Sequence, residues 1–266
     1  MLKNTMNKLS EVPVIFIHYP TGSGGWFLSA LIHYGFDQSM EFRFDQVGSG
    51  HANDHVRYIN NFYTDVTLTP EYDKIIKDEG YDEFTYEQRI KFLQDSIVIH
   101  RTDITQTLSL HCKNINVFLD AFPNSKCIQI NIDDSDLMLC TANFLYKRLL
   151  TKTLFDVFCE RNGIAQDQIA TAYDKFTKIR DSKANLEYFK WAVPFVLSTA
   201  KNMPNDPKFD DRIFEIMFKE YMFDNLDNVL AALLNFAGVE YDQSFYDELY
   251  GYVLRYRLEQ PRFTTE

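Results

Sequence analysis

The chain has 266 residues, of which 45% are hydrophobic and 24% charged, and its formal net charge is −11. These values are typical of a globular protein with a sizeable core, and they exclude a disordered or low-complexity chain. The negative excess, without any run of basic residues, argues against nucleic acid and anionic membranes as partners, because both are bound through clustered Lys and Arg.

Neither a targeting segment nor a membrane span is expected. Residues 1–12 are polar and lack the apolar core of a signal peptide. Apolar stretches such as Trp191 to Leu197 are too short to cross a bilayer. The four cysteines have no CxxC pairing and no zinc-ligand spacing; they are Cys112, Cys127, Cys140 and Cys159. We therefore predict buried thiols in a reducing compartment, the cytoplasm.

The first predicted unit is a strand, a Gly-rich turn and a helix that follow one another directly. Val12 to Tyr19 is a β-branched and aromatic run, and apolar residues from Trp26 onwards recur at helical spacing. A helix N-terminus offers unpaired N–H groups and a partial positive charge, so this turn is suited to a phosphate- or sulfate-like anion. The residues predicted to hold the anion are Pro20, Thr21, Gly22, Ser23, Gly24, Gly25 and Trp26.

The sequence allows two interpretations of this turn. In the first, the glycines let the backbone approach the anion, while Thr21 and Ser23 add hydroxyl donors. In the second, the segment is a plain tight connection between strand and helix. It is not a Walker A loop in either case, because the Gly-Lys-Ser/Thr ending is absent.

Strand and helix signals alternate along the rest of the chain. Strands are predicted at 96–100, 126–132 and 212–217, and helices at 86–94, 114–122, 137–150, 225–237 and 242–257. This alternation predicts an α/β fold with three α/β/α layers and a central, mostly parallel sheet. We expect one domain over 1–266, with a helical insertion at about 151–203. Ligands of such sheets bind at the carboxyl ends of the strands, where 19–25, 100–103 and 132–136 are expected to meet.

The succession of these pieces resembles the sulfotransferase family, whose members transfer a sulfuryl group from 3′-phosphoadenosine 5′-phosphosulfate (PAPS). Tyr19, Pro20 and Trp26 match the family's Y-P-K-S-G-T-T-W-like loop, and His100 ends a strand like the family's K-T-H segment. Further matches are Asp136 after the strand at 126–132, Phe218 to Tyr221 and Phe236 to Gly238. The resemblance implies a P-loop NTPase-like, sulfotransferase-like fold, PAPS as donor, and a small-molecule or glycan acceptor with a hydroxyl or amine.

The resemblance also assigns roles to individual residues. His100 becomes the catalytic base, and an imidazole pKa of about 6.5 suits proton transfer near neutrality. Arg101 is predicted to bind the donor and to supply positive charge. Each role has a structural alternative. His100 could be a histidine held only by a hydrogen bond, and Arg101 could form a surface ion pair with Asp103. No metal is expected, because His51 and His55 have metal-ligand spacing but no third ligand.

Four positions depart from the family pattern. Thr21 and Val98 stand in place of lysines, and Ile132 and Cys140 stand in place of the arginine and serine that bind the 3′-phosphate. An active sulfotransferase-like enzyme and a catalytically weakened or inactive nucleotide- or anion-binding protein of the same fold therefore both remain open. A P-loop kinase or NTPase ranks last, because its lysine is missing. The sequence indicates neither the acceptor nor the oligomeric state.

Overall fold

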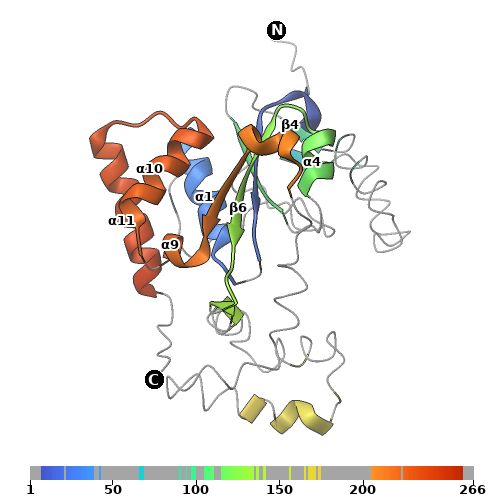
Figure 1. Ribbon diagram of the computed structural model, residues 1–266, viewed down its shortest axis with the longest axis vertical. Coiled ribbons are helices and arrows are strands. Elements are labelled where there is room, and N and C mark those ends of the chain that lie inside the picture. The colour runs from blue at the N-terminus through green and yellow to red at the C-terminus, as the bar shows by residue number, and fades with distance from the viewer. Residues whose placement is uncertain are drawn as a thin grey trace.

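The computed structural model describes residues 7–20, 22–38, 42, 66–68, 90, 94, 97–99, 105–110, 115–134, 136, 137, 140, 141, 156, 165, 167–171, 173, 174, 205–222 and 224–259. At the centre of this part of the chain lies a four-stranded sheet (Figure 1). Its strands, in spatial order, are β5 (Gln106–Leu110), β2 (Val14–His18), β6 (Ser125–Asn131) and β7 (Ile213–Met217). All neighbouring pairs are parallel.

Helices cover both faces of this sheet. On one face lie α1 (Gly25–Phe36), α10 (Leu226–Ala237) and α11 (Gln243–Glu259), and on the other lies α4 (Ile115–Ala121) (Figure 1). Successive side chains of a strand point to opposite faces, so β2 contributes to both cores. Ile15 and Ile17 join the core formed with α1, α10 and α11. Phe16 instead meets Phe118 and Phe122, with ring centroids 5.8 Å and 5.4 Å away. The predicted three-layer α/β/α fold is confirmed.

Most of the predicted elements form where the local pattern places them. β2, α1, α4, β6, β7, α10 and α11 all begin and end within two residues of their predicted bounds. The end of α10 was predicted from Gly238, and there the backbone is left-handed with φ of 83°. The N–H of Gly238 donates to Leu234 O at 3.0 Å, which closes the helix. A short helix, α9 (Phe218–Met222), continues directly from β7.

The strand predicted at 96–100 forms, but in a different sheet. β4 (Ile97–Ile99) pairs antiparallel with β1 (Asn7–Lys8) and with β3 (Val66–Leu68). The prediction that this strand ends on the rim of the parallel sheet is therefore wrong. The place beside β2 is taken by β5, which the sequence analysis missed. β5 has a weak apolar signal because Gln106 and Thr107 are polar, although they are only 0% and 1% exposed.

The two remaining short elements are 3-10 helices, η1 (Leu9–Glu11) and η6 (Pro207–Arg212). The predicted helices at 86–94 and 137–150 and the insertion at 151–203 lie mostly outside the described residues, so they stay predictions. Cys127 and Cys140 are buried thiols outside any disulfide, as predicted, whereas Cys112 and Cys159 lie outside the described residues. Within the described part of the chain, no helix combines the length and apolarity that crossing a membrane requires.

Candidate anion-binding site

The turn between β2 and α1 has a left-handed backbone at two glycines. φ is 92° at Gly22 and 80° at Gly24, values that residues with a Cβ adopt only at a cost. Gly24 directly precedes α1, and its carbonyl accepts the N–H of Leu28 at 3.1 Å, the bond that starts the helix. Two of the three glycines predicted for anion binding, Gly22 and Gly24, are therefore also required by the local backbone.

Ser23 holds this turn closed. Its side-chain Oγ donates to Pro20 O at 2.8 Å, and its backbone N–H donates to the same oxygen at 3.1 Å. The side chain is 0% exposed. The hydroxyl predicted to bind an anion is therefore used inside the turn, in the manner of a serine that stabilises a tight connection.

The N–H groups of Gly24 and Gly25 are the donors that the turn offers. Neither group has an acceptor within the described part of the chain. They stand at the start of α1, a helix of 12 residues, where the helix dipole adds partial positive charge. Gly24 is partly exposed and Gly25 is buried. Two adjacent unused N–H groups at a helix start form a chemical environment suited to one tetrahedral oxyanion.

Aromatic side chains fix the turn from two sides. Tyr19 lies so close to Gly25 that a Cβ there would be 2.0 Å from its ring. On the other side, a Cβ on Gly24 would lie 3.0 Å from the Tyr256 hydroxyl and 3.4 Å from Met222 Sδ. The Tyr256 ring also stacks on Phe27, with centroids 3.9 Å apart and planes at 7°. The last turns of α11 thus pack against the start of α1.

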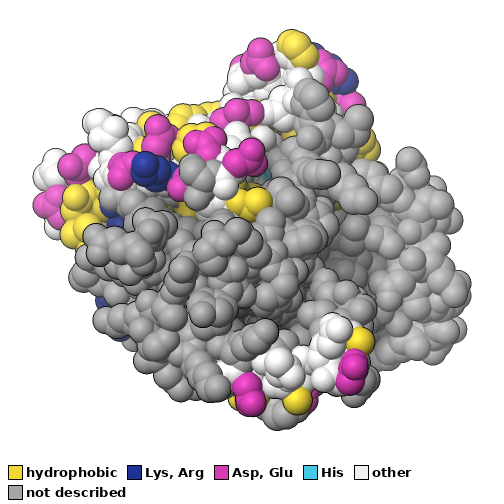
Figure 2. Space-filling model, turned by 60° about the horizontal axis from the view of Figure 1, so that its bottom comes forward, with side chains coloured by type: hydrophobic (Ala, Val, Ile, Leu, Met, Phe, Trp, Pro, Cys, Tyr) yellow, Lys and Arg dark blue, Asp and Glu magenta, His cyan; other side chains and the backbone are white. Residues whose placement is uncertain are grey.

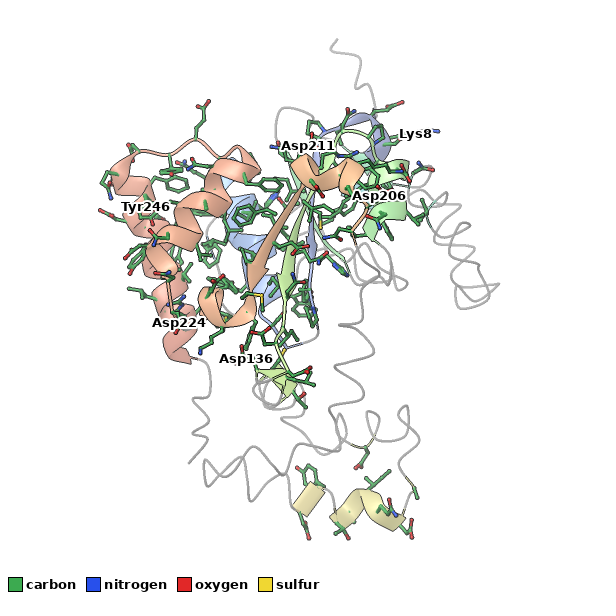
Figure 3. All side chains as sticks on the ribbon, viewed as in Figure 1. Lys8, Asp136, Asp206, Asp211, Asp224 and Tyr246 are labelled. Atoms are coloured by element: carbon green, nitrogen blue, oxygen red, sulfur yellow. The ribbon has the colours of Figure 1, made fainter. Side chains whose placement is uncertain are left out.

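Among the described residues, carboxylates lie near the rim where β6 and β7 end. Asp136 and Asp224 both lie there, near α9 (Figure 3). Burial raises the pKa of Asp136, Asp133 and Asp224 raise it further, and Lys219 lowers it. On the face shown in Figure 2, most charged side chains of the described residues are acidic. The carboxylates of Asp136, Asp133 and Asp224 therefore place negative charge at the described part of this end of the sheet.

Cys140, which the sequence resemblance aligned with a phosphate-binding serine, is not suited to bind an anion. The residue is 0% exposed, and burial, followed by the charge of Asp136, raises the pKa of its thiol. A neutral buried thiol is a weak donor and behaves as a small apolar side chain.

The structure brings together six of the predicted site residues: Pro20, Gly22, Ser23, Gly24, Gly25 and Trp26. Thr21, His100 and Arg101 lie outside the described residues, so their predicted roles stay predictions. The same applies to the histidine pair His51 and His55. Among the described residues, no three His, Cys, Asp or Glu side chains are grouped as metal ligands.

The pairing of β5 with β2 points to a histidine that the sequence analysis missed. Leu110 ends β5 and pairs with His18, after which β2 runs into the turn. The next residue in the sequence after Leu110 is His111, itself outside the described residues. The available signal was a histidine directly after Leu108 and Leu110, which the neighbouring polar residues of β5 obscured.

No protein-family model matches this sequence, and no curated protein matches it. Among solved structures, the chain is similar to retinol dehydratase in a complex with retinol and PAP. The identity is 13% and the TM-score 0.44, over 96% of this chain and 67% of that one. The α/β class of this chain is established by its own parallel sheet and its two helical layers.

Proposed function

We propose that this chain is a sulfotransferase-like enzyme that transfers a sulfuryl group from a nucleotide donor of the PAPS type to a hydroxyl or amine. The observation that carries the proposal is the turn after β2, where Gly24 and Gly25 present unused N–H groups at the start of α1. Such a pair stabilises negative charge on a sulfuryl or phosphoryl oxygen without any metal. The acceptor is a small molecule or a glycan, and the proposed location is the cytoplasm, where thiols such as those of Cys127 and Cys140 stay reduced.

The reaction needs a base for the acceptor. In the transfer, the acceptor oxygen or nitrogen bonds to sulfur, the bond from sulfur to the donor's phosphate oxygen breaks, and the base takes the acceptor's proton. Two histidines are proposed for this step. His100 is the base that the sequence resemblance indicates. His111 follows β5, the strand that pairs with β2, and this pairing favours it over His100.

A non-catalytic binding protein of the same fold is the second candidate. It is favoured by the internal use of the Ser23 hydroxyl and by the burial of Cys140, which leave few groups for phosphate contacts. Such a protein would bind the nucleotide through the turn but release no product.

A transfer assay separates these two functions. The purified chain is incubated with hydroxyl and amine acceptors and with either PAPS or adenosine 5′-phosphosulfate, and release of the desulfated nucleotide is measured. Turnover supports the enzyme. Binding without turnover supports the second candidate. The absence of both binding and turnover contradicts the proposal.

The base is assigned with His100→Ala and His111→Ala variants in the same assay. Loss of a general base lowers the rate by roughly a hundredfold or more. The variant that keeps its activity still contains the base. Its rate should therefore still change with pH around the pKa of a group that titrates near neutrality. Full activity in both variants would remove histidine from the mechanism.

A further inference from the structure

Helix α11 buries one face and exposes the other. The buried residues recur every three or four positions and join the core that α11 shares with α1 and α10: Phe245, Leu249, Val253 and Tyr256. The exposed residues follow the same spacing on the other side: Asp247, Gly251, Leu254 and Arg255. Figure 1 shows α11 at the edge of the helical layer. Because residues three and four apart lie on one side of a helix, these four residues form one surface, which we call the outer face of α11.

Gly251 lies in the middle of the outer face, where nothing among the described residues requires a glycine. A glycine inside a helix is less stable than an alanine, because it loses more conformational freedom on folding. Gly251 is not among the glycines with a left-handed backbone, and a Cβ there would meet no described atom within 4 Å. What Gly251 does provide is a low point on the surface, where a second helix can approach the backbone of α11 closely.

Leu254 exposes apolar surface next to this low point. Its exposed fraction is 40%, and it is the one large hydrophobic side chain that is exposed among the described residues. It follows Gly251 by three residues, so the two lie side by side on the outer face. A lone leucine on a surface is ordinary, but a leucine beside an open glycine is what a pair of packed helices buries at its contact.

The charges of the outer face are arranged symmetrically about Gly251. Asp247 lies four residues before it and Arg255 four residues after it, and both are exposed. If a second copy of α11 crosses at Gly251 in the opposite direction, Asp247 of each copy faces Arg255 of the other. A parallel crossing would instead place Asp247 against Asp247 and Arg255 against Arg255. The outer face is therefore complementary to itself in the antiparallel arrangement and not in the parallel one.

We propose that the chain forms a two-fold symmetric dimer in which α11 packs antiparallel against α11 of a second copy, with the helices crossing at Gly251. Leu254 of each copy then lies beside Gly251 of the other. Asp247 Oδ1 accepts a hydrogen bond from Gln243 Nε2 at 2.8 Å, and a carboxylate has further lone pairs for an arginine. Arg255 has five N–H donors, so it can bind this carboxylate in addition to the contacts within its own chain.

The dimer and the anion turn use opposite faces of α11. Tyr256, on the buried face, packs on Phe27 with ring centroids 3.9 Å apart, and its hydroxyl would lie 3.0 Å from a Cβ on Gly24. A second copy on the outer face leaves these contacts in place. Dimerisation and the proposed sulfuryl transfer are therefore tested separately, and the failure of either one leaves the other standing.

The test is sedimentation equilibrium of the full chain at concentrations from about 1 μM to 1 mM. A single pair of helices buries less surface than a standard interface, so dimerisation is expected to be weak, with a Kd of roughly 10–500 μM. Higher salt should weaken it further, because exposed ion pairs are screened. A chain that stays monomeric throughout, or that forms assemblies larger than a dimer, overturns the proposal, since a two-fold contact closes at two copies.

Charge reversal identifies the face that makes the contact. Asp247→Arg and Arg255→Asp each place like charges together in a homodimer, and each should weaken dimerisation by about tenfold or more. Mixing the two variants should restore the dimer, because both contacts then join an arginine to an aspartate. Glu240→Arg is the matched control: it changes the net charge as Asp247→Arg does, at an exposed residue before α11, and it should dimerise as tightly as the unaltered chain. A mixture that stays monomeric overturns the proposal.

Gly251→Lys tests the close approach of the two helices. A Cβ at this position meets no described atom within 4 Å, so the variant should fold, and circular dichroism should show an unchanged or raised melting temperature in dilute solution. Its long side chain should block the crossing and weaken dimerisation by about tenfold or more. Dimerisation of Gly251→Lys with the Kd of the unaltered chain would place the contact elsewhere and overturn the proposal.

Discussion

The ring of Tyr19 packs directly against Gly25, so that a Cβ on Gly25 would stand 2.0 Å from Tyr19 Cδ1 and Cγ. This contact joins the end of β2 to the start of α1 and leaves no room for a side chain. The absence of a side chain at Gly25 is therefore required both by the fold and by the proposed anion site.

Gly25→Ala is expected to destabilise the protein by about 1–3 kcal/mol or more, because the ring must move to admit the methyl group. Anion binding should be lost with it. Gly251→Ala in α11 is the matched control, since a Cβ there meets nothing within 4 Å. Because Gly251 lies inside a helix, Gly251→Ala should stabilise the protein by about 0.5–1 kcal/mol. Urea denaturation measures both, and equal effects in the two variants would contradict the packing argument.

Gly24→Ala tests the left-handed backbone of the turn. The φ of 80° at Gly24 and of 83° at Gly238 carry a similar conformational cost for alanine, about 1–2 kcal/mol. Only Gly24 has neighbours, Tyr256 and Met222, that a new Cβ would touch. Gly24→Ala should therefore lower the melting temperature more than Gly238→Ala and should alone weaken sulfate binding. A weakened anion affinity in Gly238→Ala would show that the effect is not local.

Asp136 should make stability depend on pH. Burial raises its pKa above the ordinary value of 3.8, so the folded state binds this proton more tightly than the unfolded chain does. The ionised carboxylate therefore costs stability above the folded pKa, and the cost disappears as the pH falls towards 3.8.

Asp136→Asn is accordingly expected to be more stable than the wild type near neutral pH and to lose this advantage in acid. Denaturant titrations of both proteins across this pH range measure the difference, with Asp134→Asn as the exposed control. A constant difference at every pH would mean that the ionisation of Asp136 plays no part.

Arg212 connects β7 to the end of α4. Its Nε donates to Ser125 O at 2.8 Å, and its Nη2 donates to Phe122 O at 2.8 Å and to Leu119 O at 3.0 Å. Arg212→Ala should cost about 2–4 kcal/mol, because it removes charged donors from several partly buried carbonyls at once, although Phe122 O keeps the Ser125 N–H and hydroxyl as donors.

Lys208→Ala provides the comparison for Arg212 in a chemical denaturation experiment. Lys208 bridges Asp120 at 3.0 Å, but both side chains are about half exposed, at 51% and 60%. Exposed ion pairs add little to stability, so the unfolding midpoint should barely move. A larger loss of stability in Lys208→Ala than in Arg212→Ala would contradict the argument that the Arg212 contacts contribute more.

Local sequence patterns determined most of the elements. The apolar spacing from Trp26 to Phe36 defined α1, and Gly238 marked the end of α10, because hydrophobic period and left-handed glycine are properties of neighbouring residues. The Gly-rich turn was found for the same reason. Its positive φ angles follow from residues that are adjacent in the chain.

Strand partners and distant contacts were decided only by the tertiary structure. The apolar segment at 97–99 reads as a core strand, yet it pairs outside the parallel sheet, while polar Gln106 and Thr107 are buried beside β2. The same holds for Tyr256, which packs against Gly24 from the opposite end of the chain. Sequence by itself determined which segments form strands and which form helices, because that choice depends on neighbouring residues. Which segments meet depends on the joint burial of residues far apart in the chain, and no local pattern contains that information.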